Sequence, residues 1–235
     1  MSLYVIPRRH ILAAGLGFPS VLLAQERKGP ETGQEKPIGA AEDLMREHGI
    51  LRRILLVYAE TAPTIAKAGS SLDVGALHAA AKLFRSFGED YHEKKLEEDN
   101  VFPALRTAEP SMAGLIRTLA GQHEKGRQIT DHILGATAGG KIGSNLAEPL
   151  AAQMRALVRM YQNHTAREDT IVFPAWKRTL SQPKLDALSE KFEGIEKQTF
   201  GTDGFEDAAR QIADIEQRLG LADLDHFTAS APTLP

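Results

Sequence analysis

Hydrophobic residues recur at helical spacing along most of the chain from about residue 40 onward. Leu44, Leu51 and Leu55, for example, fall on one face of a helix. No stretch shows the sustained alternation of apolar and polar residues that indicates a strand. The pattern therefore predicts an all-α protein.

Interruptions of this periodicity divide the first part of the region into four long helices. The second helix has Ser71 or Asp73 as a candidate N-cap. Four long helices joined by short polar loops predict an up-down-up-down antiparallel four-helix bundle. The predicted helices span residues 40 to about 69, about 72–107, 111–137 and about 146–180.

Two shorter helical patterns follow, at about 184–198 and 205–219. They carry few chemically reactive groups, and we expect them to cover the bundle or to mediate association. The last residues, from about His226, are expected to fray. The predicted organisation is thus a bundle over residues 40–181 and a helical extension over residues 182–235.

The N-terminus has the pattern of a secretory signal. Arg8 and Arg9 precede a short apolar run over residues 11–24, and a polar stretch follows. The paired arginines resemble a twin-arginine signal, a route that exports folded proteins. We therefore expect a signal peptide over residues 1–24, a linker over residues 25–39, and a periplasmic protein without membrane insertion. A Sec signal with a chance arginine pair and an uncleaved anchor are the alternatives.

Composition limits the chemistry. The 235 residues are 42% apolar and 25% charged, as in ordinary soluble domains. The net charge of −3 gives no support for nucleic-acid binding. The absence of cysteine excludes disulfides, thiolate zinc sites and iron–sulfur clusters. Any metal must therefore be bound by nitrogen and oxygen.

Two segments of the chain repeat each other, at residues 92–103 and 164–174. Each begins with a histidine, continues to an acidic residue and ends in Val-Phe-Pro. Glu97 and Glu168 both stand five positions before the phenylalanine. The matching contexts indicate two equivalent carboxylates.

The spacing within the two repeats differs by one residue. His164 and Glu168 are four apart and share a helix face, whereas His92 and Glu97 are five apart and do not in a regular α-helix. A one-residue π-bulge between His92 and Glu97 would bring them together, and such bulges are frequent at functional sites. Without a bulge, the alternative acids are Glu93 and Glu98.

Two further histidines, His48 and His123, lie on apolar helix faces of the first and third helices. An unpartnered polar group in such a position is costly. Four helices thus each supply an inward histidine and two of them also supply a carboxylate, which predicts a site for two metal ions. The predicted ligands are His48, His92, Glu97, His123, His164 and Glu168. His10, His78, His132 and His226 are not expected to be ligands.

With these residues the chain resembles the bacterial hemerythrin-like, or HHE, family over roughly residues 41–180. The resemblance is carried by Glu47-His48, by the two repeats, and by His123 with Arg127. It implies two non-haem iron ions joined by an oxo or hydroxo group, with the four histidines as terminal ligands. Glu97 and Glu168 would bridge the irons.

The resemblance also implies a function. Such a protein binds dioxygen or a related small ligand such as nitric oxide or peroxide. Its role would be oxygen binding or sensing, or iron handling, and we expect a binding protein rather than an enzyme. Oxygen-carrying members have a second histidine four residues after the one on the third helix, where this chain has Arg127. One fewer imidazole argues against a reversible oxygen carrier, and an open iron position favours sensing, nitric oxide or peroxide chemistry, or iron storage. The alternative function is a di-iron redox enzyme, an oxidase or a peroxide or nitric oxide scavenger.

Two other classes remain as hypotheses. A ferritin-like di-iron protein requires Glu-x-x-His on two helices, and only Glu89 with His92 fits. A metal-free helical module would leave at least six inward polar groups to satisfy. Tyrosines near the predicted ligands are interpreted as core aromatics rather than as hydrogen-bond donors to the site; they are Tyr58, Tyr91 and Tyr161.

Overall fold

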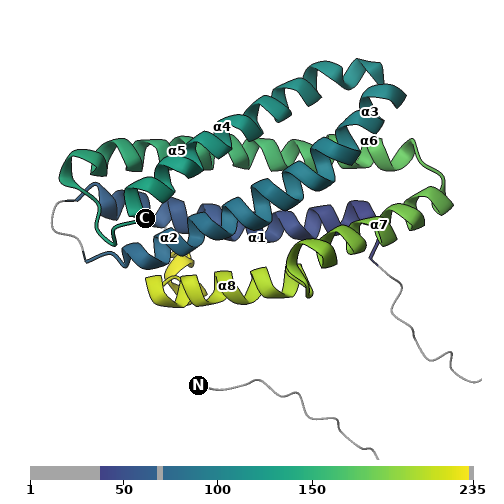
Figure 1. Cartoon of the computed structure of the whole chain (residues 1–235). Coiled ribbons are helices and arrows are strands. Elements are labelled where there is room, and N and C mark those ends of the chain that lie inside the picture. The colour runs from purple at the N-terminus through teal and green to yellow at the C-terminus, as the bar shows by residue number, and fades with distance from the viewer. Residues whose placement is uncertain (1–37, 68–70, 233–235) are drawn as a thin grey trace, which may run out of the picture. The chain divides into compact units, whose positions relative to one another are not determined.

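A computed structural model describes residues 38–67 and 71–232. Within these ranges the protein consists of helices and connecting turns, without strands (Figure 1). The all-α prediction is therefore confirmed. The predicted signal peptide over residues 1–24 and most of the predicted linker lie outside the described residues.

The first two predicted helices occur close to the expected positions. Helix α1 spans Ala40–Ile65. The second is a continuous helical stretch of three parts: α2 (Val74–Leu83), η1 (Phe84–Val101) and α3 (Phe102–Ala108). Asp73 is its N-cap, and its side chain accepts a hydrogen bond of 2.9 Å from the Ala76 amide.

The third and fourth predicted helices are also present. The third consists of the short η2 (Pro110–Met112) and the long α4 (Ala113–Thr137). The fourth consists of α5 (Ser144–Arg167), η3 (Glu168–Val172) and α6 (Phe173–Arg178).

These stretches pack side by side (Figure 1). Helix α1 lies against α5, and α4 lies against α5, α2 and η1. The interface is filled by apolar side chains on the inward faces, including Leu44, Leu51 and Leu55, all at most 2% exposed. Burial of this apolar surface holds the helices together.

Two segments, η1 and η3, are π-helical, with hydrogen bonds between residues five apart. The π-type bonding expected between His92 and Glu97 is confirmed, and it extends over all of η1. The turn in η3 was not predicted. Each segment ends in the same way, because the amide of the phenylalanine before the proline bonds back to the carbonyl of Glu97 or Glu168.

The prolines account for the wide turn that ends each repeat, but not for the rest of η1, which begins at Phe84. Pro103 and Pro174 have no amide hydrogen and cannot continue the regular helical ladder. The turn before each proline therefore loses one α-helical bond, and a wider turn is tolerated there. This local effect positions Glu97 and Glu168 in equivalent ways.

The C-terminal extension covers the long helices. It consists of α7 (Gln182–Phe200), α8 (Gly204–Leu219) and η4 (Leu224–Phe227). Helix α7 contacts α1 and η1, and α8 contacts α1 and α2 (Figure 1). Arg53 of α1 forms a two-pronged ion pair with Glu216 of α8, with one contact of 2.9 Å. The extension therefore packs on the long helices. This agrees with the expectation that it covers them; the other expectation was that it mediates association.

Among the helices in residues 38–67 and 71–232, none combines the length and the apolar character needed to cross a membrane.

The packing of α8 gives a stability prediction. Ile212 is 0% exposed, whereas Leu224 in η4 is 78% exposed. Ile212→Ala should lower the free energy of unfolding by about 2–5 kcal/mol, because it removes buried apolar contacts and leaves a cavity. Leu224→Ala should change it by less than about 0.5 kcal/mol. Urea denaturation of both variants measures the difference, and equal effects would contradict the packing of α8.

Candidate metal centre

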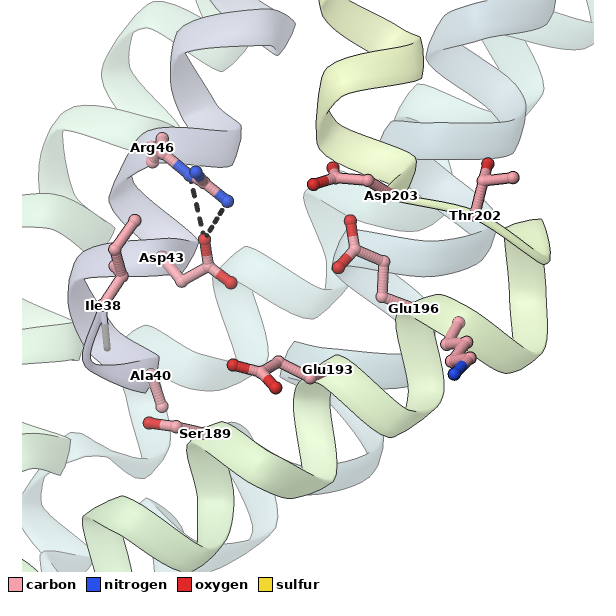
Figure 2. A pocket seen from close by; sticks show the side chains of 10 residues that line it. Ile38, Ala40, Asp43, Arg46, Ser189, Glu193, Glu196, Thr202 and Asp203 are labelled. Atoms are coloured by element: carbon pink, nitrogen blue, oxygen red, sulfur yellow. Dashed lines mark hydrogen bonds and ion pairs between the residues drawn. The ribbon is translucent and has the colours of Figure 1, made fainter. Parts of the chain in front are cut away.

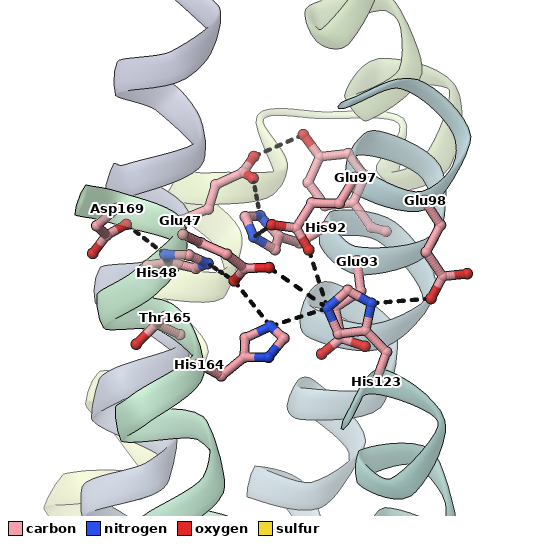
Figure 3. Close-up of polar contacts among 12 residues, drawn as sticks. Glu47, His48, His92, Glu93, Glu97, Glu98, His123, His164, Thr165 and Asp169 are labelled. Atoms are coloured by element: carbon pink, nitrogen blue, oxygen red, sulfur yellow. Dashed lines mark hydrogen bonds and ion pairs between the residues drawn. The ribbon is translucent and has the colours of Figure 1, made fainter. Parts of the chain in front are cut away.

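All six predicted ligands converge in the interior, between α1, η1, α4 and the α5–η3 stretch (Figure 3). Each is at most 2% exposed. Two overlapping groups have potential ligand atoms within 4.8 Å of one another, and both contain Glu97. One group is Glu97, His123, His164 and Glu168; the other is His48, His92 and Glu97.

Glu97 lies between two histidines from different helices. Its Oε1 is 3.4 Å from Nε2 of His92, and its Oε2 is 3.3 Å from Nε2 of His123. The wide turns of η1 allow His92 to reach a carboxylate five positions further along the same helix. The cluster thus has two halves, one with His48 and His92 and the other with His123 and His164. One oxygen of Glu97 faces each half.

Glu168 takes a similar place on the opposite side. Its Oε2 is 2.9 Å from Nε2 of His164 and 3.5 Å from Nε2 of His48. Its Oε1 is 3.9 Å from Nε2 of His123. Each carboxylate thus faces imidazoles of both halves, as a carboxylate shared between two metal ions must.

The outward nitrogens of the histidines are also bonded. His92 Nδ1 donates to Oε2 of Glu47 at 2.6 Å, and His164 Nδ1 donates to Oε1 of Gln122 at 2.9 Å. Each partner immediately precedes a candidate ligand on another helix. These bonds fix the imidazoles with Nε2 facing the centre.

The other two histidines are held from the opposite helices. His48 Nδ1 bonds to Asp169 Oδ1 at 2.7 Å, and His123 Nδ1 bonds to Glu98 Oε1 at 3.1 Å. Here each partner immediately follows a central carboxylate. All four imidazoles are therefore oriented by a neighbouring helix.

Two arginines complete this outer layer. Arg52 bonds to Asp169, and Arg127 Nη2 bonds to Glu98 Oε1 at 2.6 Å. From the sequence, Arg127 was noted only because it stands where oxygen-carrying members of the family have a histidine. In the structure it holds Glu98, the carboxylate that orients His123. The motif His-x-x-x-Arg occurs after Glu47 and again after Gln122, and this repetition could have revealed the role from sequence.

The phenylalanines of the two repeats flank the cluster. The Phe102 ring stacks on the His123 ring with centroids 5.6 Å apart and an interplanar angle of 13°. Phe173 lies beside His48, with centroids 5.4 Å apart. Each repeat thus supplies a carboxylate to the centre and an apolar ring that keeps water from an imidazole.

The centre fits a metal by its unsatisfied atoms. Both oxygens of Glu97, both oxygens of Glu168 and Nε2 of His92 are buried without a hydrogen-bond partner. Leaving such atoms unpaired in an apolar interior is costly. Cations placed among these oxygens and nitrogens would satisfy them.

Without a cation the two carboxylates do not ionise equally. Burial raises the pKa of Glu168 well above its usual value, and the charge of Glu97 raises it further. Burial also opposes ionisation of Glu97, but His92 and His123 outweigh it and hold the pKa of Glu97 below its usual value. Without a cation, Glu97 therefore ionises more readily than Glu168.

Two histidines of the centre share a proton. Nε2 of His123 is 3.0 Å from Nε2 of His164. Burial and the nearby charge of His123 lower the pKa of His164 to about 3. Burial opposes the charged form of His123 as well, but the carboxylates around it raise its pKa well above the usual value. His123 therefore donates this hydrogen bond and His164 accepts it.

The interpretation of the tyrosines as core residues needs correction for two of the three. Tyr91 donates to Glu47 Oε1 at 2.8 Å, and Tyr161 donates to Glu93 Oε1 at 2.6 Å. Only Tyr58 is a core aromatic with no hydrogen bond to its hydroxyl oxygen. The alternative acids lie in the outer layer: Glu93 accepts from Tyr161, and Glu98 bonds to Arg127 and to the outward Nδ1 of His123.

Of the histidines excluded by the sequence, the three that the structure describes lie outside both ligand groups. His132 bonds to Gln153 and His78 bonds to Thr137, the latter at 2.8 Å. Both are half-buried rather than fully exposed, and each bonds to a side chain of a neighbouring helix. His226 is exposed, and His10 lies outside the described residues.

Two surface pockets lie apart from the centre. A pocket of about 450 Å³ lies between the start of α1 and α7, and it is rich in acidic side chains such as Asp43, Glu193 and Glu196 (Figure 2). A second, of about 280 Å³, is lined by residues of α1 and α5 that include Arg52 and Thr165. None of the six candidate ligands lines either pocket.

The fold and the site define a helical protein with a buried histidine–carboxylate cluster suited to metal. Residues 39–176 match the family described as the hemerythrin HHE cation binding domain. The chain belongs to this family. The description of the family and the cluster together support metal binding.

Relatives extend the match beyond the family domain. Uncharacterized proteins of Mycobacterium bovis and of two strains of Mycobacterium tuberculosis are each 39% identical over 237 residues. The alignment covers 96% of this chain and 92% of each relative. No solved structure matches the chain significantly.

The packing beside the centre can be tested at two glycines of α4. A Cβ on Gly126 would lie 2.2 Å from the hydroxyl oxygen of Tyr161, whereas one on Gly121 would meet nothing within 4 Å. Gly126→Ala should destabilise the protein by about 1–3 kcal/mol, because Tyr161 must move away from Glu93. Gly121→Ala should stabilise it by about 0.5–1 kcal/mol. Equal unfolding midpoints in denaturant would refute this contact.

Proposed function

We propose that this chain is a non-haem di-iron protein that binds dioxygen or a related small ligand. One observation carries the proposal: two buried carboxylates each face imidazoles of both halves, and their four oxygens have no hydrogen-bond partner. In this proposal the four long helical stretches form an up-down-up-down antiparallel bundle around the two ions. The bundle occupies residues 40–181, and the extension occupies residues 182–235.

The donor set supports iron. Imidazole and shared carboxylate ligands without thiolates suit ferrous and ferric ions. His48 and His92 would hold one ion and His123 and His164 the other, with Glu97 and Glu168 bridging. A bound pair of ferrous ions supplies up to two electrons to a small ligand.

The chain's own residues determine what surrounds such a ligand. The inner histidines and carboxylates are at most 2% exposed, so bulk water is kept from the centre. The outer bonds to Nδ1 keep each imidazole in place with Nε2 facing the centre. This is a rigid interior that a small neutral molecule fits better than a bulky substrate.

A second candidate, a di-iron redox enzyme, is favoured by Arg127. Arg127 stands where oxygen-carrying members of the family have a further histidine, and its guanidinium bonds to Glu98 instead of facing the centre. A metal ion in the half containing His123 would have fewer protein ligands than in an oxygen-carrying member, and more room for a reactive molecule. Steady-state consumption of dioxygen or hydrogen peroxide by the iron-loaded protein separates an enzyme from a binding protein.

The proposed location is the periplasm, reached by the twin-arginine route. It rests on Arg8 and Arg9 and the apolar run of residues 11–24. Replacing both arginines with lysine should abolish export if this route is used. Continued export of the variant would favour the Sec route.

Iron content tests the ligands directly. The wild-type chain should hold about two iron ions, and His48→Ala or Glu168→Ala should lower this sharply, because each removes a donor from a small buried set. His132→Ala is the matched control and should leave the iron content unchanged, since His132 bonds only to Gln153 in another part of α4–α5.

Elemental analysis of the purified variants measures this, together with circular dichroism to confirm folding. Equal iron in all three variants would refute the ligand assignment. A visible spectrum that bleaches on reduction and changes reversibly on exposure to oxygen would favour the binding function over the redox enzyme.

A further inference from the structure

The residues around the centre form a repeat that is broken at one position. Asp169 and Glu98 orient corresponding histidines, and each is paired with an arginine, Arg52 or Arg127. In both contacts a carboxylate bonds to a histidine and is paired with an arginine. The other two outer contacts occupy corresponding positions but do not match.

In one half the outer partner is Glu47. Its carboxylate is 1% exposed, accepts from His92 at 2.6 Å and accepts from the neutral hydroxyl of Tyr91 at 2.8 Å. No lysine or arginine of the described residues forms an ion pair with it. Its charge is therefore directed at His92.

In the other half the corresponding partner is Gln122. Its amide oxygen accepts from His164 Nδ1 at 2.9 Å. The geometry of the contact resembles that of Glu47 with His92, but the acceptor is neutral. The two halves thus differ by one carboxylate in the layer that touches the imidazoles.

From this difference we infer that the half containing His48 and His92 binds its metal ion more tightly than the half containing His123 and His164, and that Glu47 against Gln122 sets the difference. The inference rests on the proposed di-metal function.

The physical reason lies in the imidazole. A carboxylate that accepts from Nδ1 makes Nε2 a stronger donor and adds negative charge near the cation. A neutral amide does this less. The inner donors work in the other direction, because Glu168 groups with His123 and His164 and contacts only His48 of the other half, at 3.5 Å. Exchanging residues 47 and 122 leaves these inner donors unchanged, so the exchange isolates the outer carboxylate.

One other acid acts in the opposite direction. Glu93 is buried near His123 and adds negative charge to that half. It bonds to Tyr161 rather than to an imidazole, and Arg127 lies 3.5 Å from its other oxygen. Its effect is therefore offset by a cation and is not transmitted through a histidine ring. Exchanging only residues 47 and 122 leaves it constant.

The experiment is an anaerobic titration of the metal-free full chain with Fe²⁺ in the presence of a competing chelator. It resolves two stepwise dissociation constants for the wild type, Glu47→Gln, Gln122→Glu and the double exchange. Glu47→Gln should weaken the tighter step by about 10–100-fold and bring the two steps together. Gln122→Glu should strengthen the weaker step, and the double exchange should restore the wild-type separation.

The outcomes are distinguishable. Two equal steps in the wild type, or a separation unchanged in both single variants, would overturn the inference while leaving the di-metal site intact. Failure of the wild type to bind Fe²⁺ would overturn the proposed function itself. Both substitutions keep the side-chain size, and Gln122→Glu, at a partly exposed position, still provides the test if Glu47→Gln does not fold.

Discussion

The burial of two carboxylates in one apolar interior is the constraint on which the rest of the structure depends. Glu97 and Glu168 are 0% exposed, and neither oxygen of either residue has a hydrogen-bond partner. Such groups are tolerated only where positive charge compensates them. The four imidazoles aimed at these oxygens, the outer partners that orient the imidazoles, and the flanking phenylalanines all follow from that requirement.

The connection between helices is made by residues next to the ligands in sequence. Neighbours in a helix point about 100° apart, so a residue beside an inward ligand faces an adjacent helix. Glu47 and Gln122 use this direction to reach His92 and His164, and Glu98 and Asp169 use it to reach His123 and His48. Each helix thus supplies both a group for the centre and the support for a group on another helix.

Much of this arrangement could be predicted from the sequence, because periodicity within one helix determines which face is inward. That was enough for the helix boundaries, for the convergence of the six predicted ligands and for the π-type turn after His92. The roles of Tyr91 and Gln122 could not be found that way, since they depend on contacts between helices. The role of Arg127 also depends on such a contact, and only the repeated His-x-x-x-Arg motif pointed to it. The full length of η1 and the turn in η3 depend on packing and on the prolines that follow them.

X-ray absorption at the iron edge tests the central claim, that Glu97 and Glu168 hold two ions between the imidazole pairs, most directly. For the iron-loaded protein we expect ligands of nitrogen and oxygen only, and a second iron at about 3.5–4 Å. The iron–iron signal should vanish in Glu97→Ala. A single isolated iron in the wild type, or a pair unaffected by loss of Glu97, would contradict the account.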